Sequence, residues 1–194
     1  MKQIVFATNN SHKLEEVRSI VGSYIDILSL SDIGCNEEIP ENGTTFEANA
    51  IEKASYIKEK YGYDCFADDS GLEVTALNNA PGVFSARYAG EPSNSQRNIE
   101  KLMCEMDGVA ERSARFRTCI ALLYEGEQVL FEGCIEGSII STLRGCNGFG
   151  YDPLFVPQGY DVTFAEMTSQ EKNKISHRAV ATQKLVEYLL RKQQ

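Results

Sequence analysis

Two adjacent carboxylates, Asp68 and Asp69, follow the apolar run 65–67 and precede Ser70 and Gly71. A short apolar run bounded by glycine is typical of a strand, so we expect a strand to end here, where Gly71 allows a sharp turn. Two carboxylates at one strand end repel each other, and a divalent cation bound by their oxygens would offset that repulsion. The alternative is a solvated turn, in which Asp, Ser and Gly are common.

A second polar segment, Thr8–Lys13, lies between a strand predicted at Ile4–Ala7 and a predicted helix. Ser11 is a candidate N-cap for that helix, and Gly22 ends it. The N–H groups at a helix N-terminus favour an anion such as phosphate, and Lys13 adds a cation. The glycines of a Walker loop are missing, and an ordinary strand-to-helix connection is the alternative interpretation.

Three further segments carry candidate binding residues. The loop predicted over 31–43 contains Glu41, and a capping box of Thr44 and Glu47 begins the next helix. That helix is expected to stop near Gly62. Lys53 lies on it, either turned towards a site or left as a solvated charge. In the Gly-aromatic segment 144–160, the centre is Phe149, Gly150, Tyr151 and Asp152. Glycine allows close approach to a flat ligand and aromatic rings can stack on a base, although a packed surface loop is equally compatible. Lys172, His177 and Arg178 crowd together before the last predicted helix.

The remaining pattern predicts an α/β fold with a mixed sheet. Two long extended runs, Ala114–Tyr124 and Gln128–Ile140, are joined by a short segment containing Gly126, which predicts an antiparallel hairpin. Further elements are expected as strands at Ile25–Leu30 and Leu72–Val74, and as helices at Ser95–Met106 and after Ser176.

The composition limits the classes of function. The chain has 194 residues, 42% hydrophobic and 24% charged, with a formal net charge of -9. One domain, residues 1–194, is the natural expectation at this length. A protein this acidic is a poor match for a nucleic-acid backbone, which is bound by clustered Lys and Arg, so we expect no nucleic-acid partner.

The cysteines and the apolar runs indicate the compartment. Six scattered cysteines form no Cys-x-x-Cys pair, and the two histidines lie far apart, which argues against a zinc site. Cys65, Cys119 and Cys134 lie in apolar runs and are expected to be buried thiols. The sequence shows no signal peptide and no run long enough to span a membrane. We therefore expect a cytoplasmic protein without a membrane partner.

Three kinds of group together match a nucleoside triphosphate. The acids could bind a metal, the cations could neutralise phosphates, and the Gly-aromatic loop could bind a base. The acids are Glu41, Asp68 and Asp69, and the cations are Lys13, Lys53, Lys172 and Arg178, with Arg87 as a further candidate. Phosphoryl transfer depends on positioning and charge stabilisation, with Mg²⁺ bridging phosphate oxygens and a carboxylate accepting a proton from water.

Six motifs follow one another along the chain. They are Thr8–Lys13, Glu41–Phe46 with Asn49-Ala50, Ala67–Leu72, Pro81-Gly82 with Ser85–Tyr88, Gly148–Pro153, and Glu171-Lys172 with Ser176-His177-Arg178. With these motifs in this order, the chain resembles a known family, the inosine triphosphate (dITP/XTP) pyrophosphatases, over residues 4 to about 190.

This resemblance implies a function and a role for each matched residue. The family is magnesium-dependent and homodimeric, and it hydrolyses inosine, deoxyinosine and xanthosine triphosphates to the monophosphate and pyrophosphate, cleansing the nucleotide pool. By position, Asp69 is the catalytic proton acceptor and a metal ligand, with Glu41 as a second ligand and Asp68 in support. The matched substrate-binding residues are Thr8, Asn9, Asn10, Ser11, His12 and Lys13 for the phosphates, Ser70 as a further substrate contact, and Phe149, Gly150, Tyr151, Asp152, Lys172, His177 and Arg178 for the base. Lys53 lies outside the six motifs and is expected to bind substrate because it is one of the cations named above.

We therefore expect an elongated mixed β-sheet flanked by helices, in two lobes with the active site in the cleft between them. One alternative is a nucleotide pyrophosphatase for another base, such as a modified pyrimidine. Another is a regulatory module that binds nucleotide without turnover. The clustered carboxylates argue against that module, because they would repel phosphates unless a metal were present.

Overall fold

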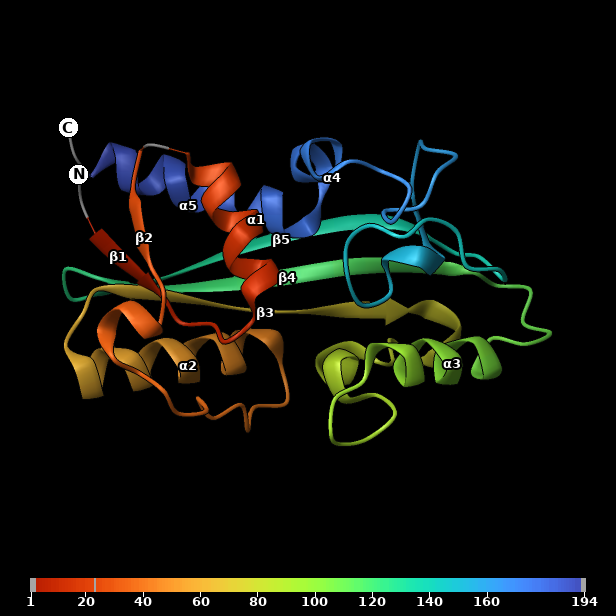
Figure 1. Cartoon of the computed structure of the whole chain (residues 1–194), viewed down its shortest axis with the longest axis horizontal. Helices are drawn as coiled ribbons and strands as arrows, with labels where there is room; N and C mark the ends of the chain where they lie inside the picture. Colours follow the sequence, from red (N-terminus) through yellow and green to blue (C-terminus); the bar gives the residue numbers. More distant parts are fainter. Residues whose placement is uncertain (1–2, 23, 193–194) are drawn as a thin grey trace. The chain divides into compact units, whose positions relative to one another are not determined.

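The computed structural model describes residues 3–22 and 24–192, and the chain divides into two compact units (Figure 1). Unit 1 comprises Met1–Asp69, Thr118–Gly133 and Arg178–Gln194. Unit 2 comprises Ser70–Arg117 and Cys134–His177. Each unit has a hydrophobic core of its own.

A six-stranded sheet has the order β2-β1-β3-β4-β5-β6. The strands are β1 (Gln3–Phe6), β2 (Asp26–Leu28), β3 (Cys65–Val74), β4 (Ser113–Tyr124), β5 (Glu127–Ile139) and β6 (Phe155–Pro157). β1 pairs in parallel with β2 and β3, whereas β5 and β6 are antiparallel, which confirms the predicted mixed sheet. Glu125 and Gly126 both have positive φ and form the two-residue connection between β4 and β5.

Five helices accompany the sheet in the described residues (Figure 1). They are α1 (Ser11–Val21), α2 (Phe46–Tyr61), α3 (Ser95–Glu105), α4 (Ser169–Ile175) and α5 (His177–Arg191), with short 3-10 turns η1 (Ser31–Ile33), η2 (Thr75–Leu77), η3 (Gly82–Arg87) and η4 (Asp152–Leu154). The predicted ends of α1 and α2 at Gly22 and Gly62 are confirmed, because each glycine is the C-cap.

Two predicted N-caps are each wrong by one residue. The side chain of Asn10, rather than Ser11, accepts the hydrogen bond from the backbone of Lys13. Likewise Thr45, rather than Thr44, caps α2 by accepting from the backbone of Ala48. In both places two neighbouring residues have suitable polar side chains, so local sequence alone does not choose between them.

The core of unit 1 lies on both faces of the strands. α1 and α5 pack on one face, with Val17, Val21, Leu185 and Leu189 against β-strand residues that include Phe66. α2 packs on the other face, through Ala50, Ala54 and Ile57, against β-strand residues that include Cys65 and Ala67. Side chains of consecutive strand residues point to opposite faces, so Phe66 and Cys65 enter different cores. This alternation continues into Asp68 and Asp69 and decides the partners of each.

The core of unit 2 is rich in aromatic side chains. Phe116 packs edge-to-face on Phe155, with ring centroids 4.8 Å apart, and is stacked against Phe164 at 5.9 Å. Ile99, Leu102 and Met106 of α3 belong to the same cluster.

Two expectations about chain path are wrong. β3 does not end at the aspartates but continues through Ser70 and Gly71 as one ten-residue strand. Sheet pairing satisfies its backbone, and the two carboxylates avoid repulsion because they point to opposite faces.

α4 was missed because its residues are polar, yet Thr168 and Glu171 form a complete capping box at its start.

Within the described parts of the chain, we find no helix with the length and apolar character needed to cross a membrane.

Candidate active site

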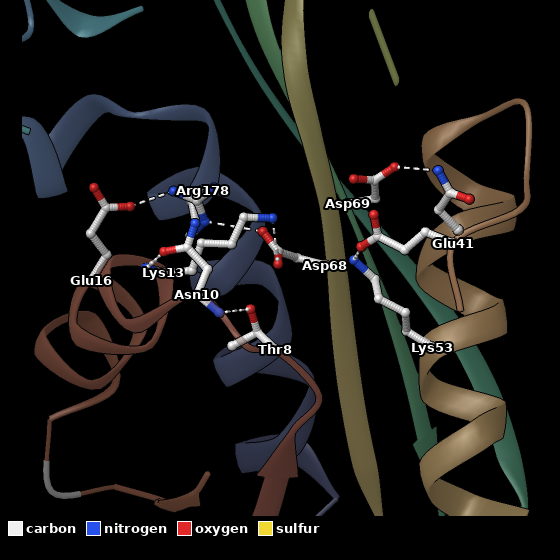
Figure 2. A network of polar contacts seen from close by, with 10 residues as sticks. Thr8, Asn10, Lys13, Glu16, Glu41, Lys53, Asp68, Asp69 and Arg178 are labelled. Atoms are coloured by element: carbon white, nitrogen blue, oxygen red, sulfur yellow. Dashed lines mark hydrogen bonds and ion pairs between the residues drawn. The ribbon is translucent and has the colours of Figure 1, made fainter. Parts of the chain in front are cut away.

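Asp68 and Asp69 lie on opposite sides of β3 (Figure 2). The carboxylate of Asp68 points towards Lys13 and Arg178, on the side covered by α1 and α5. The carboxylate of Asp69 points the other way, towards Glu41 on the side covered by α2. The two adjacent acids therefore belong to two different groups of side chains.

Asp68 is fully buried and is held by two cations. Lys13 Nζ donates to its Oδ1 at 3.0 Å, and Arg178 Nε donates to its Oδ2 at 3.1 Å. Burial by itself would raise the pKa of Asp68, but the charges of Lys13 and Arg178 outweigh it and hold the pKa well below the usual range. Arg178 also donates to the carboxylate of Glu16, on α1. The result is a chain of alternating charges from α1 through β3 to α5.

The turn before α1 is organised by its own side chains. Thr8 Oγ1 accepts from the backbone N–H of Asn10 at 3.2 Å, and Asn10 Oδ1 accepts from the backbone N–H of Lys13 at 3.2 Å. These bonds fix the start of the helix, where backbone N–H groups favour an anion. Asn9, Ser11 and His12 are exposed along the same turn. The predicted phosphate-binding segment is thus gathered around one helix N-terminus, with Lys13 beside it.

Asp69 has a different environment. It is 6% exposed, and Asn49 Nδ2 donates to its Oδ2 at 2.8 Å. Glu41 forms an ion pair with Lys53, the lysine that is buried on α2. Burial raises the pKa of Asp69, and the charge of Glu41 raises it further, while Lys53, Lys13 and the amide of Asn49 oppose this. A carboxylate whose pKa is raised by burial is suited to accept a proton.

The three predicted metal ligands are not gathered into one group. Among the described residues, no set of three or more His, Cys, Asp or Glu side chains is placed to hold a metal ion. Asp68 lies on the other face of β3, where Lys13 and Arg178 already bind its two oxygens. Glu41 and Asp69 lie on the same side of the strand, so that their charges interact. Two oxygen donors of this kind fit Mg²⁺, which usually takes one or two carboxylates and completes its shell with water and phosphate.

The Gly-aromatic loop in unit 2 is built around Asp152. Its Oδ2 accepts from the backbone N–H of Phe149 at 2.9 Å and from Lys172 Nζ at 2.7 Å. Asp152 and Lys172 are both buried, and the Lys172 ammonium lies 4.9 Å from the centroid of the Phe149 ring. Gly148 allows this arrangement, because a Cβ there would lie 2.0 Å from Asp152 Oδ2. Three predicted base-binding residues, Phe149, Asp152 and Lys172, therefore form one packed cluster.

The other predicted base-binding residues have separate neighbours. Tyr151 is buried in the aromatic core, and its hydroxyl donates to the backbone oxygen of Ser85 at 2.9 Å. The ring of His177 is stacked on Phe116 at 4.8 Å, with an interplanar angle of 12°. Arg178 follows directly in the chain but belongs to unit 1, where it pairs with Asp68. The structure thus groups Arg178 with the predicted phosphate-binding residues, and its role towards the base stays a prediction.

Two residues in contact with the site were missed by reasoning from residue chemistry. Asn49 belongs to a matched motif but was given no role there, and Glu16 was not among the predicted site residues. The local pattern gives no sign that Asn49 reaches Asp69, since twenty positions separate them. The distance in sequence between Glu16 and Arg178 is larger still.

Comparison with known proteins identifies the family. The Ham1 family model matches residues 4–188. The dITP/XTP pyrophosphatase of Christiangramia forsetii is 54% identical over 187 residues, covering 96% of this chain and 98% of that protein. That of Porphyromonas gingivalis is 51% identical over 191 residues, covering 98% of each.

Solved structures agree. The Ham1 protein of Staphylococcus aureus superposes with a TM-score of 0.89 at 38% identity, covering 98% of this chain and 100% of that one. The HAM1 protein of Coxiella burnetii gives a TM-score of 0.90 at 39% identity with the same coverage. These matches confirm the resemblance drawn from the six motifs. The chain belongs to the Ham1 family.

Proposed function

We propose that this chain hydrolyses non-standard purine nucleoside triphosphates, namely ITP, dITP and XTP, to the monophosphate and pyrophosphate. The observation that carries the proposal is the nearly full-length match, at 51% and 54% identity, to proteins named dITP/XTP pyrophosphatase. The reaction makes the chain a hydrolase of a phosphoric anhydride bond that removes such nucleotides from the pool.

In the proposed reaction, Asp69 accepts a proton from the attacking water. The water oxygen forms a bond to the α or the β phosphorus, and the P–O bond from that phosphorus to the oxygen bridging the two breaks. The electron pair of the broken bond leaves with pyrophosphate after attack at the α phosphorus, and with the nucleoside monophosphate after attack at the β phosphorus. The buried setting of Asp69 supports this role, because its raised pKa makes it a better proton acceptor than an ordinary aspartate. No covalent enzyme intermediate is required.

The proposed triphosphate site is the N-terminus of α1 with Lys13 and Lys53. The hydrogen bonds among Thr8, Asn10 and Lys13 support it, because they hold backbone N–H groups in the geometry that binds anions. Asn9, Ser11, His12 and Ser70 are the further proposed contacts. The net charge of -9 makes such a local group of cations necessary for an anionic substrate.

The proposed base site is the cluster of Phe149, Gly150, Tyr151 and Asp152 with Lys172, together with His177 and Arg178. Hypoxanthine and xanthine carry a keto oxygen at position 6, where adenine carries an amino group. Lys172 and Arg178 can only donate hydrogen bonds, so they satisfy the keto oxygen and leave an amino group without an acceptor. Each buried donor left unpaired costs about 1–3 kcal/mol, which discriminates against adenine.

We further propose that Mg²⁺ is the cofactor and that Glu41 and Asp69 hold it, with Asp68 acting only through Lys13 and Arg178. Bound with substrate, the ion would neutralise negative charge on the phosphate oxygens. The carboxylates of Glu41 and Asp69, on the same side of β3, support this assignment. Removing the ion with EDTA should abolish pyrophosphate release, and adding back Mg²⁺ should restore it.

A cytoplasmic homodimer is the proposed state of the protein. The absence of a disulfide bond among the described residues, with Cys35 and Cys65 buried as thiols, supports a reducing compartment. The dimer follows from the family resemblance alone, and light scattering at micromolar concentration would test it.

A substrate panel tests the function. ITP, XTP, GTP, ATP and dTTP are each incubated with enzyme and Mg²⁺, and pyrophosphate and orthophosphate are measured separately. We expect fast pyrophosphate release from ITP and XTP. Release of orthophosphate instead would refute the proposed reaction. Faster hydrolysis of dTTP than of ITP would show that the enzyme prefers a pyrimidine base. Tight binding of ITP without turnover would favour a regulatory module.

A further inference from the structure

A buried amide on α2 connects the proposed catalytic acid to the loop that carries Glu41. Asn49 is 1% exposed, and both ends of its side chain are bonded. Its Nδ2 donates to Asp69 Oδ2 at 2.8 Å, and its Oδ1 accepts from the backbone N–H of Gly43 at 2.7 Å. Figure 2 draws the first of these bonds as the dashed line from Asp69.

The chemistry of the two partners fixes the orientation of the amide. A backbone N–H can only donate, so the group facing Gly43 must be the carbonyl oxygen. The NH₂ group therefore faces Asp69, whose ionised carboxylate can only accept. A single rotamer of Asn49 satisfies both partners, and reversing the amide would place like groups against each other at both ends.

The backbone at Gly43 is close enough that only glycine fits. A Cβ at this position would lie 2.8 Å from Asn49 Oδ1, 2.8 Å from Ala48 Cβ and 3.0 Å from the backbone nitrogen of Asn49. The loop is thereby seated directly on the first turn of α2. The preceding residue, Asn42, holds the loop a second time. Glu52 accepts hydrogen bonds from both its backbone and its side chain, at 2.7 and 2.8 Å.

We propose that Asn49 is a positioning residue for the hydrolysis. It fixes the rotation of the Asp69 carboxylate and at the same time fixes the position of the Glu41 loop relative to that carboxylate. This inference rests on the proposed function, in which Asp69 accepts the proton of water. Misplacing a reacting group by about 1 Å can lower a rate by about 10²-fold, so loss of Asn49 should act on kcat rather than on substrate binding.

Asn49→Ala is the direct test. We expect kcat for ITP to fall by about 10²-fold while KM stays within about threefold, because the variant keeps the proposed phosphate and base contacts. Asn42→Ala is the matched control, since Asn42 holds the same loop but contacts Glu52 and not Asp69. It should keep kcat within about threefold of the wild type.

A double-mutant cycle separates positioning from mere support of the fold. In an Asp69→Asn background, Asn49→Ala should lower kcat by less than about threefold, because the carboxylate that it positions is gone and the two bonds of Asn42 to Glu52 still hold the Glu41 loop. A full further 10²-fold loss in that background, or an unchanged kcat in the single variant, would overturn the proposal. Thermal unfolding of each variant shows that the compared proteins are folded.

If Asn49→Ala is too unstable to purify, Asn49→Asp replaces it. Aspartate keeps the size of the side chain and the acceptor for Gly43, but it turns an acceptor towards Asp69 and should give the same loss of kcat. An unchanged kcat in this variant would count against the proposal equally. Failure of the wild type to release pyrophosphate from ITP would instead refute the proposed function, so the two failures are distinguishable.

Discussion

Asp68 and Asp69 are identical in chemistry and adjacent in β3, yet their surroundings shift their pKa values in opposite directions. On one face of the strand, Lys13 and Arg178 bind the carboxylate of Asp68 and stabilise its charge. On the other face, Asp69 accepts from the neutral amide of Asn49, and burial raises its pKa by more than the charges of Lys53 and Lys13 lower it. Burial is common to both, so the partners decide the outcome. The comparison supports the proposal that the first acid has a structural role and the second a chemical one.

The largest expected effect is on turnover, from Asp69→Asn. We expect kcat to fall by about 10³-fold or more, because an amide cannot accept the proton of the attacking water. Folding should survive, since the substituted side chain still offers an oxygen to Asn49 and removes a buried charge. Pyrophosphate release and thermal unfolding measure the two effects. Near-normal turnover would remove Asp69 from its proposed role.

Asp68→Asn should have the opposite effect and lower stability rather than turnover. It leaves the buried charges of Lys13 and Arg178 without their carboxylate, and breaking a buried ion pair in this way typically costs about 3–5 kcal/mol. The free energy of unfolding in urea should fall by an amount in this range. If stability is unchanged while turnover is lost, then Asp68 has a chemical role and the contrast between the two faces is wrong.

When stability is measured in EDTA at pH 7, Asp68→Asn and Asp69→Asn should change the free energy of unfolding in opposite directions, and both changes should depend on pH. The pKa of Asp68 is lowered in the folded protein, so its stabilisation is present above its unfolded pKa of about 4 and is lost at about 1.4 kcal/mol per pH unit below that. The pKa of Asp69 is raised, so its ionisation destabilises the folded protein at pH 7, and this penalty disappears as pH falls towards 4.

Asp68→Asn should therefore destabilise the protein at pH 7, and Asp69→Asn should stabilise it. Both differences from the wild type should shrink towards acid pH. Urea unfolding of the three proteins at pH 7 and at pH 3.5 provides the measurement. The same sign for both variants at pH 7 would contradict the assignment of opposite pKa shifts.

The smallest expected effect comes from Glu16→Gln at the outer end of the charged chain. Glu16 is partly exposed and supports Asp68 only through Arg178. We expect a loss of about 1.5–3 kcal/mol, typical of one hydrogen bond to a charged group. Glu15→Gln, an exposed neighbour on α1, is the control and should change stability by less than about 0.5 kcal/mol. Equal effects of the two substitutions would show that the chain of charges ends at Arg178.

Local signals predicted much of this fold. Gly22 and Gly62 marked two helix ends, and Gly126 marked the connection of the long hairpin. The path of β3 could not be predicted in the same way, because serine and glycine are common in turns. Here Ser70 and Gly71 instead lie within the strand. Only pairing with neighbouring strands, which depends on residues far along the chain, keeps that segment extended.

The candidate site was predictable as a set of residues but not as an arrangement. The motifs identified Glu41 and Asp69, yet they gave no reason to separate Asp68 from them. That separation follows from the two-residue period of a strand, once the segment is known to be a strand. The bonds of Asn49 to Asp69 and Gly43 required the packing of α2 against β3, which no local pattern specifies.

Because β3 stays paired through Ser70, the register of the strand decides which of the two acids faces Lys13 and Arg178 and which faces Asn49 and Glu41. Because the side chains of a strand alternate, deleting one residue upstream of Asp68 would exchange the faces of every later side chain in the strand. Asp69 would take the place of Asp68 beside the cations, and Asp68 would take the place of Ala67, on the face of β3 that α2 covers. No intermediate shift exists between these two arrangements, so the division of roles between the acids is a discrete property of the sheet rather than one that small movements can adjust.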